Sequence, residues 1–142
     1  MPIHILVIDD DPAVTELLVL LLKAHGFEAS AVNRATEGVE LIRTNKPELV
    51  ILDLMMPEMD GWEACRVIRS FSNIPIVILS ALNDPSMVAK VLDLGADDFL
   101  TKPTSSAVMI AHINKLVRRT GRLRPADAAP PLLSGTQPLP SS

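Results

Sequence analysis

Aspartates stand directly behind two apolar segments of the sequence, at a spacing that suits cation chemistry. Residues 9–11 are all aspartate and follow the apolar run 3–8, and Asp53 follows the run 48–52. Carboxylates that meet in one place repel one another, and a bound cation relieves that repulsion. A ligand set of oxygen atoms without histidine or cysteine suits Mg²⁺, or Mn²⁺ in its place. These aspartates therefore predict a divalent-cation site.

A serine and a lysine follow two further apolar runs. Ser80 comes after the run 76–79, and Lys102 comes after the run 99–101. A carboxylate can attack phosphorus and form an aspartyl phosphate, and this transfer needs charge neutralisation and positioning more than acid–base chemistry. A lysine ammonium supplies positive charge, and a serine hydroxyl can donate to a phosphoryl oxygen. Asp53, which stands alone at the end of its run, is the predicted nucleophile.

The elements that must position these residues alternate along the chain. Short apolar runs bounded by turn residues predict buried strands at 3–8, 48–52, 76–79 and 99–101, with a weaker edge strand at 28–32. Helices are predicted from Asp11 to Gly26, from Asp84 to Gly95, and at 35–45, 60–69 and 105–119. This order predicts an α/β fold, a (βα)5 doubly wound parallel sheet covered on both faces. In such sheets the site lies beyond the carboxyl ends of the strands.

Composition and charge narrow the class of protein. The chain has 142 residues, 48% of them hydrophobic, and a net charge of −4, which disfavours direct nucleic-acid binding. Cys65 is the only cysteine, so an internal disulfide and a multi-cysteine metal site are excluded. No signal peptide or membrane-length apolar run is present, and a cytoplasmic location is expected.

The end of the sequence differs from the rest in composition. Residues 121–142 hold five of the 12 prolines and no aromatic residue. Such a segment lacks the apolar side chains for a core and is interpreted as a linker or a disordered tail. The folded domain is therefore predicted to span residues 1–120.

Four motifs in this order resemble the receiver domain of bacterial response regulators, which is a CheY-like domain. They are 8–12 (IDDDP), 52–61 (LDLMMPEMDG), 79–81 (LSA) and 95–103 (GADDFLTKP), and the resemblance covers residues 3 to about 119. It implies a flavodoxin-like strand order of 2-1-3-4-5. It also implies a signalling protein in a two-component system, which promotes only its own phosphorylation and dephosphorylation.

The resemblance assigns roles at the predicted site. Asp53 corresponds to the phosphoacceptor, which takes a phosphoryl group from a sensor histidine kinase. Asp9 and Asp10 correspond to the acidic pair that holds Mg²⁺, with Asp10 the more direct ligand, and the backbone carbonyl of Met55 to a further ligand. Asp11 matches no functional position and is interpreted as a helix cap.

The resemblance also implies a switch. Ser80 corresponds to the switch hydroxyl, Lys102 to the invariant lysine, and Phe99 to the aromatic side chain that turns inward on phosphorylation. Pro103 is interpreted as fixing the peptide after Lys102, with a cis bond as one form. The apolar pair Met55 and Leu82 flanks the phosphoryl position in this fold, which predicts slow self-dephosphorylation.

Two surfaces are predicted to meet partners. Val14, Leu17, Leu18, Leu21 and Leu22 are expected to fill the inward face of the first helix, which leaves Val19 and Leu20 outward as a kinase-docking patch or as isolated surface aliphatics.

The second surface is formed by the helices at 84–94 and 105–119 and the strand at 99–101. Residues 90–99 are similar to OmpR/PhoB-type transcriptional regulators, which implies a homodimer through this face, with Lys90, Asp97 and Asp98 as contacts. Val108 stands where glutamate is usual, and His112 where arginine is usual, which disfavours the salt-bridged form. An intermolecular His112–Asp98 pair and an apolar contact through Val108 and Met109 are the alternatives.

Several functions remain open from the residues alone. The chain is interpreted as the receiver half of a regulator whose DNA-binding domain is absent, with a stand-alone response regulator as the alternative. A haloacid-dehalogenase-like phosphatase would use Asp9 as its nucleophile, but Ala13 departs from that signature. A flavodoxin-like FMN protein is disfavoured by a single Trp and no Tyr. A non-phosphorylated binding module is disfavoured by the complete set of acidic, serine and lysine residues.

Overall fold

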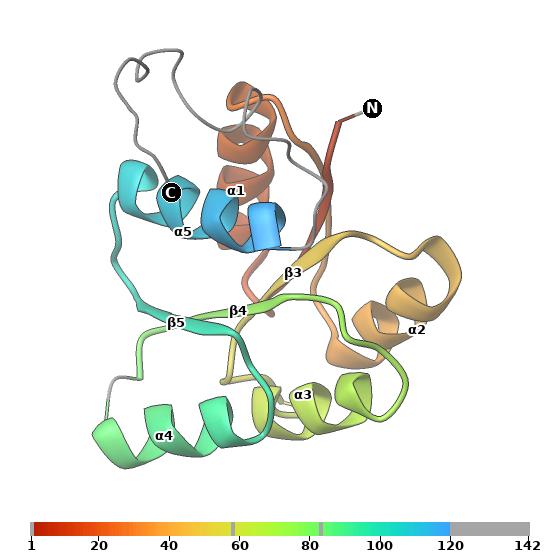
Figure 1. Cartoon of the computed structure of the whole chain (residues 1–142), viewed down its shortest axis with the longest axis vertical. Coiled ribbons are helices and arrows are strands. Elements are labelled where there is room, and N and C mark those ends of the chain that lie inside the picture. Colours follow the sequence, from red (N-terminus) through yellow and green to blue (C-terminus); the bar gives the residue numbers. More distant parts are fainter. Residues whose placement is uncertain (1, 58, 83, 120–142) are drawn as a thin grey trace, which may run out of the picture.

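A single parallel sheet forms the centre of the molecule (Figure 1). The computed structural model describes residues 2–57, 59–82 and 84–119, so the predicted tail at 121–142 lies outside the described residues. The strands are β1 (His4–Ile8), β2 (Glu28–Val32), β3 (Leu49–Leu52), β4 (Ile76–Ser80) and β5 (Asp98–Thr101). Their order is β2-β1-β3-β4-β5, which confirms the predicted fold and strand order.

Helices cover both faces of this sheet. They are α1 (Pro12–Ala24), α2 (Ala35–Asn45), α3 (Gly61–Arg69), α4 (Pro85–Asp93) and α5 (Ser106–Arg119). Figure 1 shows α1 and α5 on one side of the sheet and α2, α3 and α4 on the other. The buried side chains divide in the same way, since one core cluster includes Leu22 and Ile113, and the other includes Ile42, Ile68 and Val91. None of the described helices is long and apolar enough to cross a membrane.

Buried strands in the middle of the sheet explain the continuous apolar runs. Every side chain of β3 and β4 is buried, because helices pack against both faces of these strands. The edge strand β2 is only partly buried and carries the weaker signal. The apolar runs therefore stop at the carboxyl ends of the strands, and polar residues begin there.

Aspartate side chains begin three of the helices. The carboxylate of Asp11 accepts from the Ala13 amide at 2.9 Å, and the carboxylate of Asp84 accepts from the Ser86 amide at 2.8 Å. Both helices have proline in the first turn, as predicted. Asp60 caps α3 in the same way, although the sequence analysis did not single it out. The role of Asp11 as a helix cap is thus confirmed.

The predicted inward face of α1 is wrong at one position. Leu17 is 64% exposed, and Thr15 occupies the buried position in its place. Thr15 can be buried because its hydroxyl donates to the Pro12 carbonyl at 3.1 Å, which satisfies the polar group locally. Leu20 is 63% exposed, as predicted, whereas Val19 is only half-exposed. The outward apolar patch of α1 therefore consists of Leu17 and Leu20 more than of Val19.

Gly61 brings the start of α3 against the end of β3. A Cβ atom at this position would lie 2.5 Å from the Asp53 carbonyl oxygen and 2.5 Å from the Leu54 Cα. The Gly61 amide also donates to the Leu54 carbonyl at 2.9 Å. Only glycine permits this approach of backbone to backbone, so Gly61 helps to fix the turn that follows Asp53.

We expect Gly61→Ala to lower the free energy of unfolding by about 2–3 kcal/mol, because the new methyl group displaces backbone atoms. Gly26→Ala is the matched control. No atom lies within 4 Å of its Cβ position, and only its φ of +90° opposes the change, at a cost of about 1 kcal/mol. Urea unfolding of both variants makes the comparison. An equal or smaller loss for Gly61→Ala would show that the close backbone approach does not require glycine.

Candidate functional site

The carboxyl ends of four strands bring the predicted residues to one edge of the sheet. Asp9 follows β1, Asp53 follows β3, Ser80 ends β4 and Lys102 follows β5. The pairing of β1 with β3 places Asp9 beside Asp53, and the Asp53 amide donates to the Ile8 carbonyl at 3.0 Å. Since β2 and β3 lie on opposite sides of β1, this edge is the switch point where such folds place their sites.

Three carboxylates gather at this edge. One oxygen from each of Asp9, Asp10 and Asp53 lies within 4.8 Å of the others. Asp9 and Asp53 are buried, at 3% and 6% exposed, whereas Asp10 is open to solvent. The set offers only carboxylate oxygens, with one side open for water, which is the ligand chemistry that Mg²⁺ prefers. The residues present therefore fit a hydrated divalent cation.

Lys102 crosses from β5 to the acidic residues. Its Nζ lies 2.6 Å from Oδ2 of Asp9 and 3.6 Å from Oδ2 of Asp53. Its backbone amide donates to the Ser80 carbonyl at 2.8 Å, which fixes the start of the turn. The Lys102–Pro103 peptide bond is cis, one of the forms that the sequence analysis allowed. The structure thus directs this ammonium to the carboxylates rather than to solvent.

The electrostatics of the site oppose a charged Asp53. Burial raises the pKa of the Asp53 carboxyl, and the negative charge of Asp9 raises it further. The Lys102 ammonium, the Met55 amide and the Ser80 hydroxyl lower this pKa but do not cancel the increase. For Lys102, burial lowers the pKa, but the bond to Asp9 and the charge of Asp53 outweigh it and the pKa is raised. The site is short of positive charge.

One backbone amide and one hydroxyl lie near the carboxylate of Asp53. The Met55 amide lies 3.4 Å from Oδ1, so the Met55 backbone is close to the acidic residues, while the Met55 side chain is 56% exposed. The Ser80 hydroxyl is fully buried and accepts from the Leu82 amide at 3.3 Å. Ser80 lies near enough to Asp53 for its hydroxyl to lower the pKa of that carboxyl. The predicted switch hydroxyl is therefore close to the predicted acceptor.

Phe99 lies on β5, beside the strand that ends at Ser80. Its ring is half-buried and packs against the core cluster under α2, α3 and α4. The structure gives one position of the ring, so its predicted inward movement remains a prediction.

The predicted dimer-face residues make contacts within the chain. The Lys90 ammonium lies 5.3 Å from the centre of the Trp62 ring, a cation–π contact between α4 and α3. Oδ2 of Asp97 accepts from Arg69 Nη2 at 2.8 Å and from the Ile76 amide at 2.9 Å. Asp97 is therefore an internal link between α3, β4 and the start of β5.

His112 and Asp98 also pair inside the chain. The imidazole Nδ1 of His112 contacts Oδ2 of Asp98, and the other carboxylate oxygen accepts from the Phe99 amide. The sequence analysis placed this pair between two molecules, whereas the structure forms it between α5 and β5 of one chain. Met109 is 2% exposed, so the apolar contact predicted through Val108 and Met109 is wrong for Met109, although Val108 is 46% exposed.

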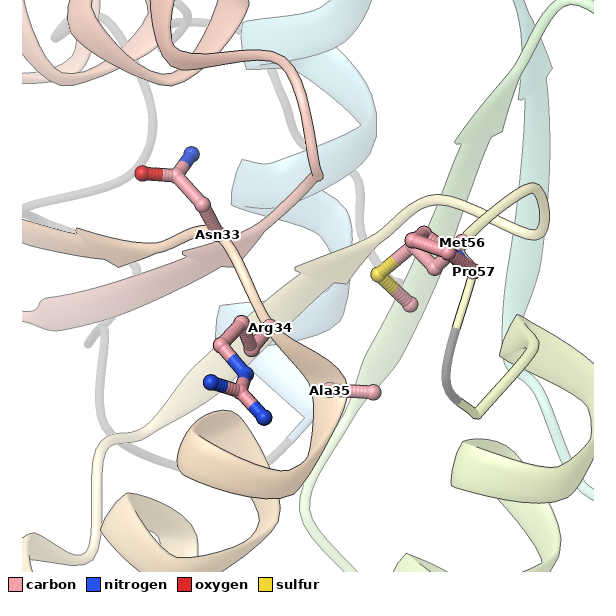
Figure 2. Close-up of a pocket in the computed structure, with 5 residues that line it drawn as sticks. All are labelled: Asn33, Arg34, Ala35, Met56 and Pro57. Atoms are coloured by element: carbon pink, nitrogen blue, oxygen red, sulfur yellow. The ribbon is translucent and has the colours of Figure 1, made fainter.

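Three cavities surround the site. An apolar groove of about 530 Å³ lies between α1 and α5, lined by residues that include Leu17, Leu21, Met109 and the stem of Lys102. A pocket of about 490 Å³ lies beside the acidic residues, next to Asp10, Met55, Asp60 and Trp62. A third, of about 210 Å³, lies between the turns at 33–35 and 56–57 (Figure 2).

Sequence reasoning missed two residues that support the acidic pair. The Asn33 side chain donates to the Asp9 carbonyl at 2.8 Å and to the Thr15 hydroxyl at 3.1 Å. A lone asparagine after a strand is a common turn residue, and these contacts span 24 and 18 positions of the sequence. The one signal in the sequence that could have identified Asn33 is its position directly after a strand.

The raised pKa of Asp53 leads to a prediction about stability. Because the folded state favours the neutral acid, the charged form opposes folding at neutral pH. We expect Asp53→Asn, without divalent cations, to raise the free energy of unfolding at pH 7. The gain should shrink as the pH falls through the folded-state pKa and vanish below the ordinary pKa of aspartate. Urea unfolding across this pH range tests it, with exposed Asp93→Asn as the control. No gain for Asp53→Asn at pH 7 would contradict the charge balance described above.

Known proteins share this sequence pattern. The curated relatives include DNA-binding response regulator MtrA of Mycolicibacterium smegmatis, which is 39% identical over 116 residues, 82% of this chain and 51% of MtrA. Response regulator MprA of Mycobacterium sp. strain KMS is 42% identical over 121 residues, 84% of this chain and 53% of MprA. Transcriptional regulatory protein CseB of Streptomyces avermitilis is 38% identical over 127 residues, 89% of this chain and 54% of CseB. The chain spans about half the length of these relatives.

Solved structures and a family model indicate the same class of protein as the curated relatives do. The BeF3-activated N-terminal receiver domain of Klebsiella pneumoniae RstA has a TM-score of 0.78 and 34% identity, covering 81% of this chain and 98% of that chain. The receiver domain of the Francisella response regulator 1452 has a TM-score of 0.79 and 33% identity, and the match covers 82% of this chain and 98% of that chain. The model of the response regulator receiver domain matches residues 5–114. The chain therefore belongs to the response regulator receiver domains.

Proposed function

We propose that the chain accepts a phosphoryl group on Asp53 from a sensor histidine kinase in the cytoplasm. The observation that carries the proposal is the position of Lys102, whose Nζ lies 2.6 Å from Asp9 and 3.6 Å from Asp53. A lysine ammonium beside a buried carboxylate suits the transfer of a phosphoryl group, because this transfer needs charge stabilisation and alignment.

The transfer exchanges one bond to phosphorus for another. A carboxylate oxygen of Asp53 bonds to the phosphorus, and the bond from phosphorus to the kinase histidine breaks, with the electron pair returning to the imidazole. The Lys102 ammonium is placed to stabilise the negative charge of the phosphoryl oxygens. The buried Ser80 hydroxyl, which lies near Asp53, supplies a hydrogen-bond donor.

Asp9, Asp10, Asp53 and the Met55 carbonyl are the residues proposed to hold Mg²⁺, or Mn²⁺. The ion, when bound, supplies the positive charge that the three carboxylates lack. The donor set described above supports this role, since it consists of carboxylate oxygens with an open side.

The phosphatase alternative needs Asp9 as its nucleophile. Asp9 is 3% exposed, and its two carboxylate oxygens are engaged by Lys102 and by the Asp11 amide. A nucleophile needs a free oxygen aimed at the substrate. Asp53 is the better acceptor because its oxygens have longer contacts, at 3.4 Å to the Met55 amide and 3.6 Å to Lys102.

The output is proposed to pass through Ser80 and Phe99 to the face of α4, β5 and α5. Phosphoryl oxygens on Asp53 would attract the Ser80 hydroxyl, and Phe99 would follow into the space left behind. Phosphorylation then shifts an existing equilibrium toward the state with the better contacts. The names of these relatives describe MtrA as a DNA-binding response regulator and CseB as a transcriptional regulatory protein, so we propose transcriptional control as the output.

Two surfaces are proposed to bind partners. The kinase would dock on the apolar surface of α1, where Leu17 and Leu20 are 64% and 63% exposed. A second copy would meet the α4–β5–α5 face, where Leu92 and Val108 are 40% and 46% exposed. We propose an apolar contact at this face, since Asp97, Asp98 and His112 already have partners inside the chain.

Incubation with Mg²⁺ and acetyl phosphate is expected to add one phosphoryl group, measured by intact mass. Asp53→Asn should remove the adduct, as should omission of Mg²⁺, whereas exposed Asp93→Asn should keep it. An adduct that persists in Asp53→Asn would place the acceptor elsewhere. An absence of the adduct from the folded native chain would reject phosphorylation as the function.

The flanking residues Met55 and Leu82 predict a long-lived aspartyl phosphate, because apolar side chains cannot orient an attacking water. We expect Met55→Asn to shorten the lifetime at least about tenfold, by adding an amide that can hold the water. Loss of the mass adduct over time measures this, with Leu20→Asn on the exposed surface of α1 as the control. A lifetime of seconds in the native chain would contradict the prediction.

A further inference from the structure

The peptide unit between Asp9 and Asp10 is held by a side chain from another strand end. The Asn33 amide donates to the Asp9 carbonyl at 2.8 Å, and the Asp9 amide donates to the Val32 carbonyl at 3.3 Å. Residues at the end of β2 therefore bond both the carbonyl and the amide of Asp9. The Asp9 carbonyl and the Asp10 amide share one planar peptide unit, so the bond from Asn33 fixes the direction in which Asp10 leaves the strand.

Asn33 is itself held in place. Its side-chain nitrogen also donates to the Thr15 hydroxyl at 3.1 Å, and this hydroxyl donates onward to the Pro12 carbonyl at 3.1 Å. Thr15 is only 5% exposed, so this hydrogen-bond chain is shielded from water. Figure 2 shows the Asn33 side chain turned away from Met56 and Pro57, across the pocket that these residues line. The amide therefore serves the acidic turn and not the pocket.

Asp10 depends on this support more than its neighbours do. Asp9 is bonded through both carboxylate oxygens, and Asp53 is close to Lys102 and the Met55 amide. The side chain of Asp10 is exposed, and no hydrogen bond or ion pair links it to another of the described residues. Its position relative to Asp9 and Asp53 is therefore set by its backbone.

We propose that Asn33 is a positioning residue that holds Asp10 in place for the divalent cation. This inference rests on the proposed function, which makes Asp10 a metal ligand. Asn33 touches neither the cation nor the phosphoryl group and acts only through the peptide unit of Asp9 and Asp10. Residues that orient metal ligands in this way commonly change metal affinity about 10–100-fold when they are replaced.

The direct test is Mn²⁺ binding to the full chain, followed by the loss of the electron paramagnetic resonance signal of free Mn²⁺. We expect Asn33→Ala to raise the dissociation constant at least about tenfold. Thr15→Val, which removes one partner of Asn33 but keeps its bond to Asp9, should have a smaller effect. Asn45→Ala, the same substitution at the exposed end of α2, should bind Mn²⁺ as the native chain does.

A second measurement separates positioning from a general loss of structure. The rate of phosphorylation by acetyl phosphate, followed by intact mass, is measured against Mg²⁺ concentration. For Asn33→Ala we expect the half-saturating Mg²⁺ concentration to rise at least about tenfold. The rate at saturating Mg²⁺ should stay within about twofold of the native rate, because a filled site no longer needs the support.

The outcomes are distinct. Native-like Mn²⁺ binding by Asn33→Ala would overturn the inference and leave the proposed function intact. A fall in the rate at saturating Mg²⁺ without a change in half-saturation would also overturn it, since Asn33 would then act on folding or chemistry. A native chain that binds no Mn²⁺ would reject the metal site of the proposed function itself.

Discussion

Repulsion among three carboxylates at one sheet edge is the constraint on which the rest of the site depends. One oxygen from each of Asp9, Asp10 and Asp53 lies within 4.8 Å of the others. The Lys102 ammonium pairs with Asp9 and Asp53, and it brings one positive charge against three ionised carboxylates. At an effective dielectric constant of 20, two unit charges 4 Å apart interact by about 4 kcal/mol. Burial and then the charge of Asp9 raise the pKa of the Asp53 carboxyl, and the Lys102 ammonium does not cancel this increase. A divalent cation has the charge that the edge lacks.

The fold meets this constraint in large part by fixing the backbone at the acidic residues. Asp9 and Asp53 extend paired strands, Gly61 allows the next helix to approach the Asp53 backbone closely, and Asn33 bonds the carbonyl before Asp10. The carboxylates are thus held close together although they repel. The strands themselves supply the rigidity, since their buried apolar side chains pack against helices on both faces.

Local signals explain what the sequence could predict. Apolar runs ended by aspartate, serine or lysine located Asp9, Asp53 and Lys102, because parallel strands bring their carboxyl ends to one edge. Side-chain contacts that do not follow from the meeting of strand ends could not be predicted. Thr15 is a polar residue that a sequence pattern would place outward on α1, and its burial depends on a hydroxyl bond and on Asn33. The internal pairing of Asp97 with Arg69, 28 positions apart, has no local signal either.

Strand β5 is anchored by an ion pair at each end. These two anchors decide how a change at the site can alter the surface of the molecule. Asp97, just before the strand, bonds Arg69 of α3, and Lys102, just after it, bonds Asp9. The phosphoryl group that we propose on Asp53 would change the charge beside Lys102, whose Nζ lies 3.6 Å from Asp53, and would leave the bond of Asp97 to Arg69 in place. Phe99 and the pair of Asp98 with His112 lie between the two anchors. Movement of the strand about the Arg69 anchor would therefore reach the face where Val108 is exposed.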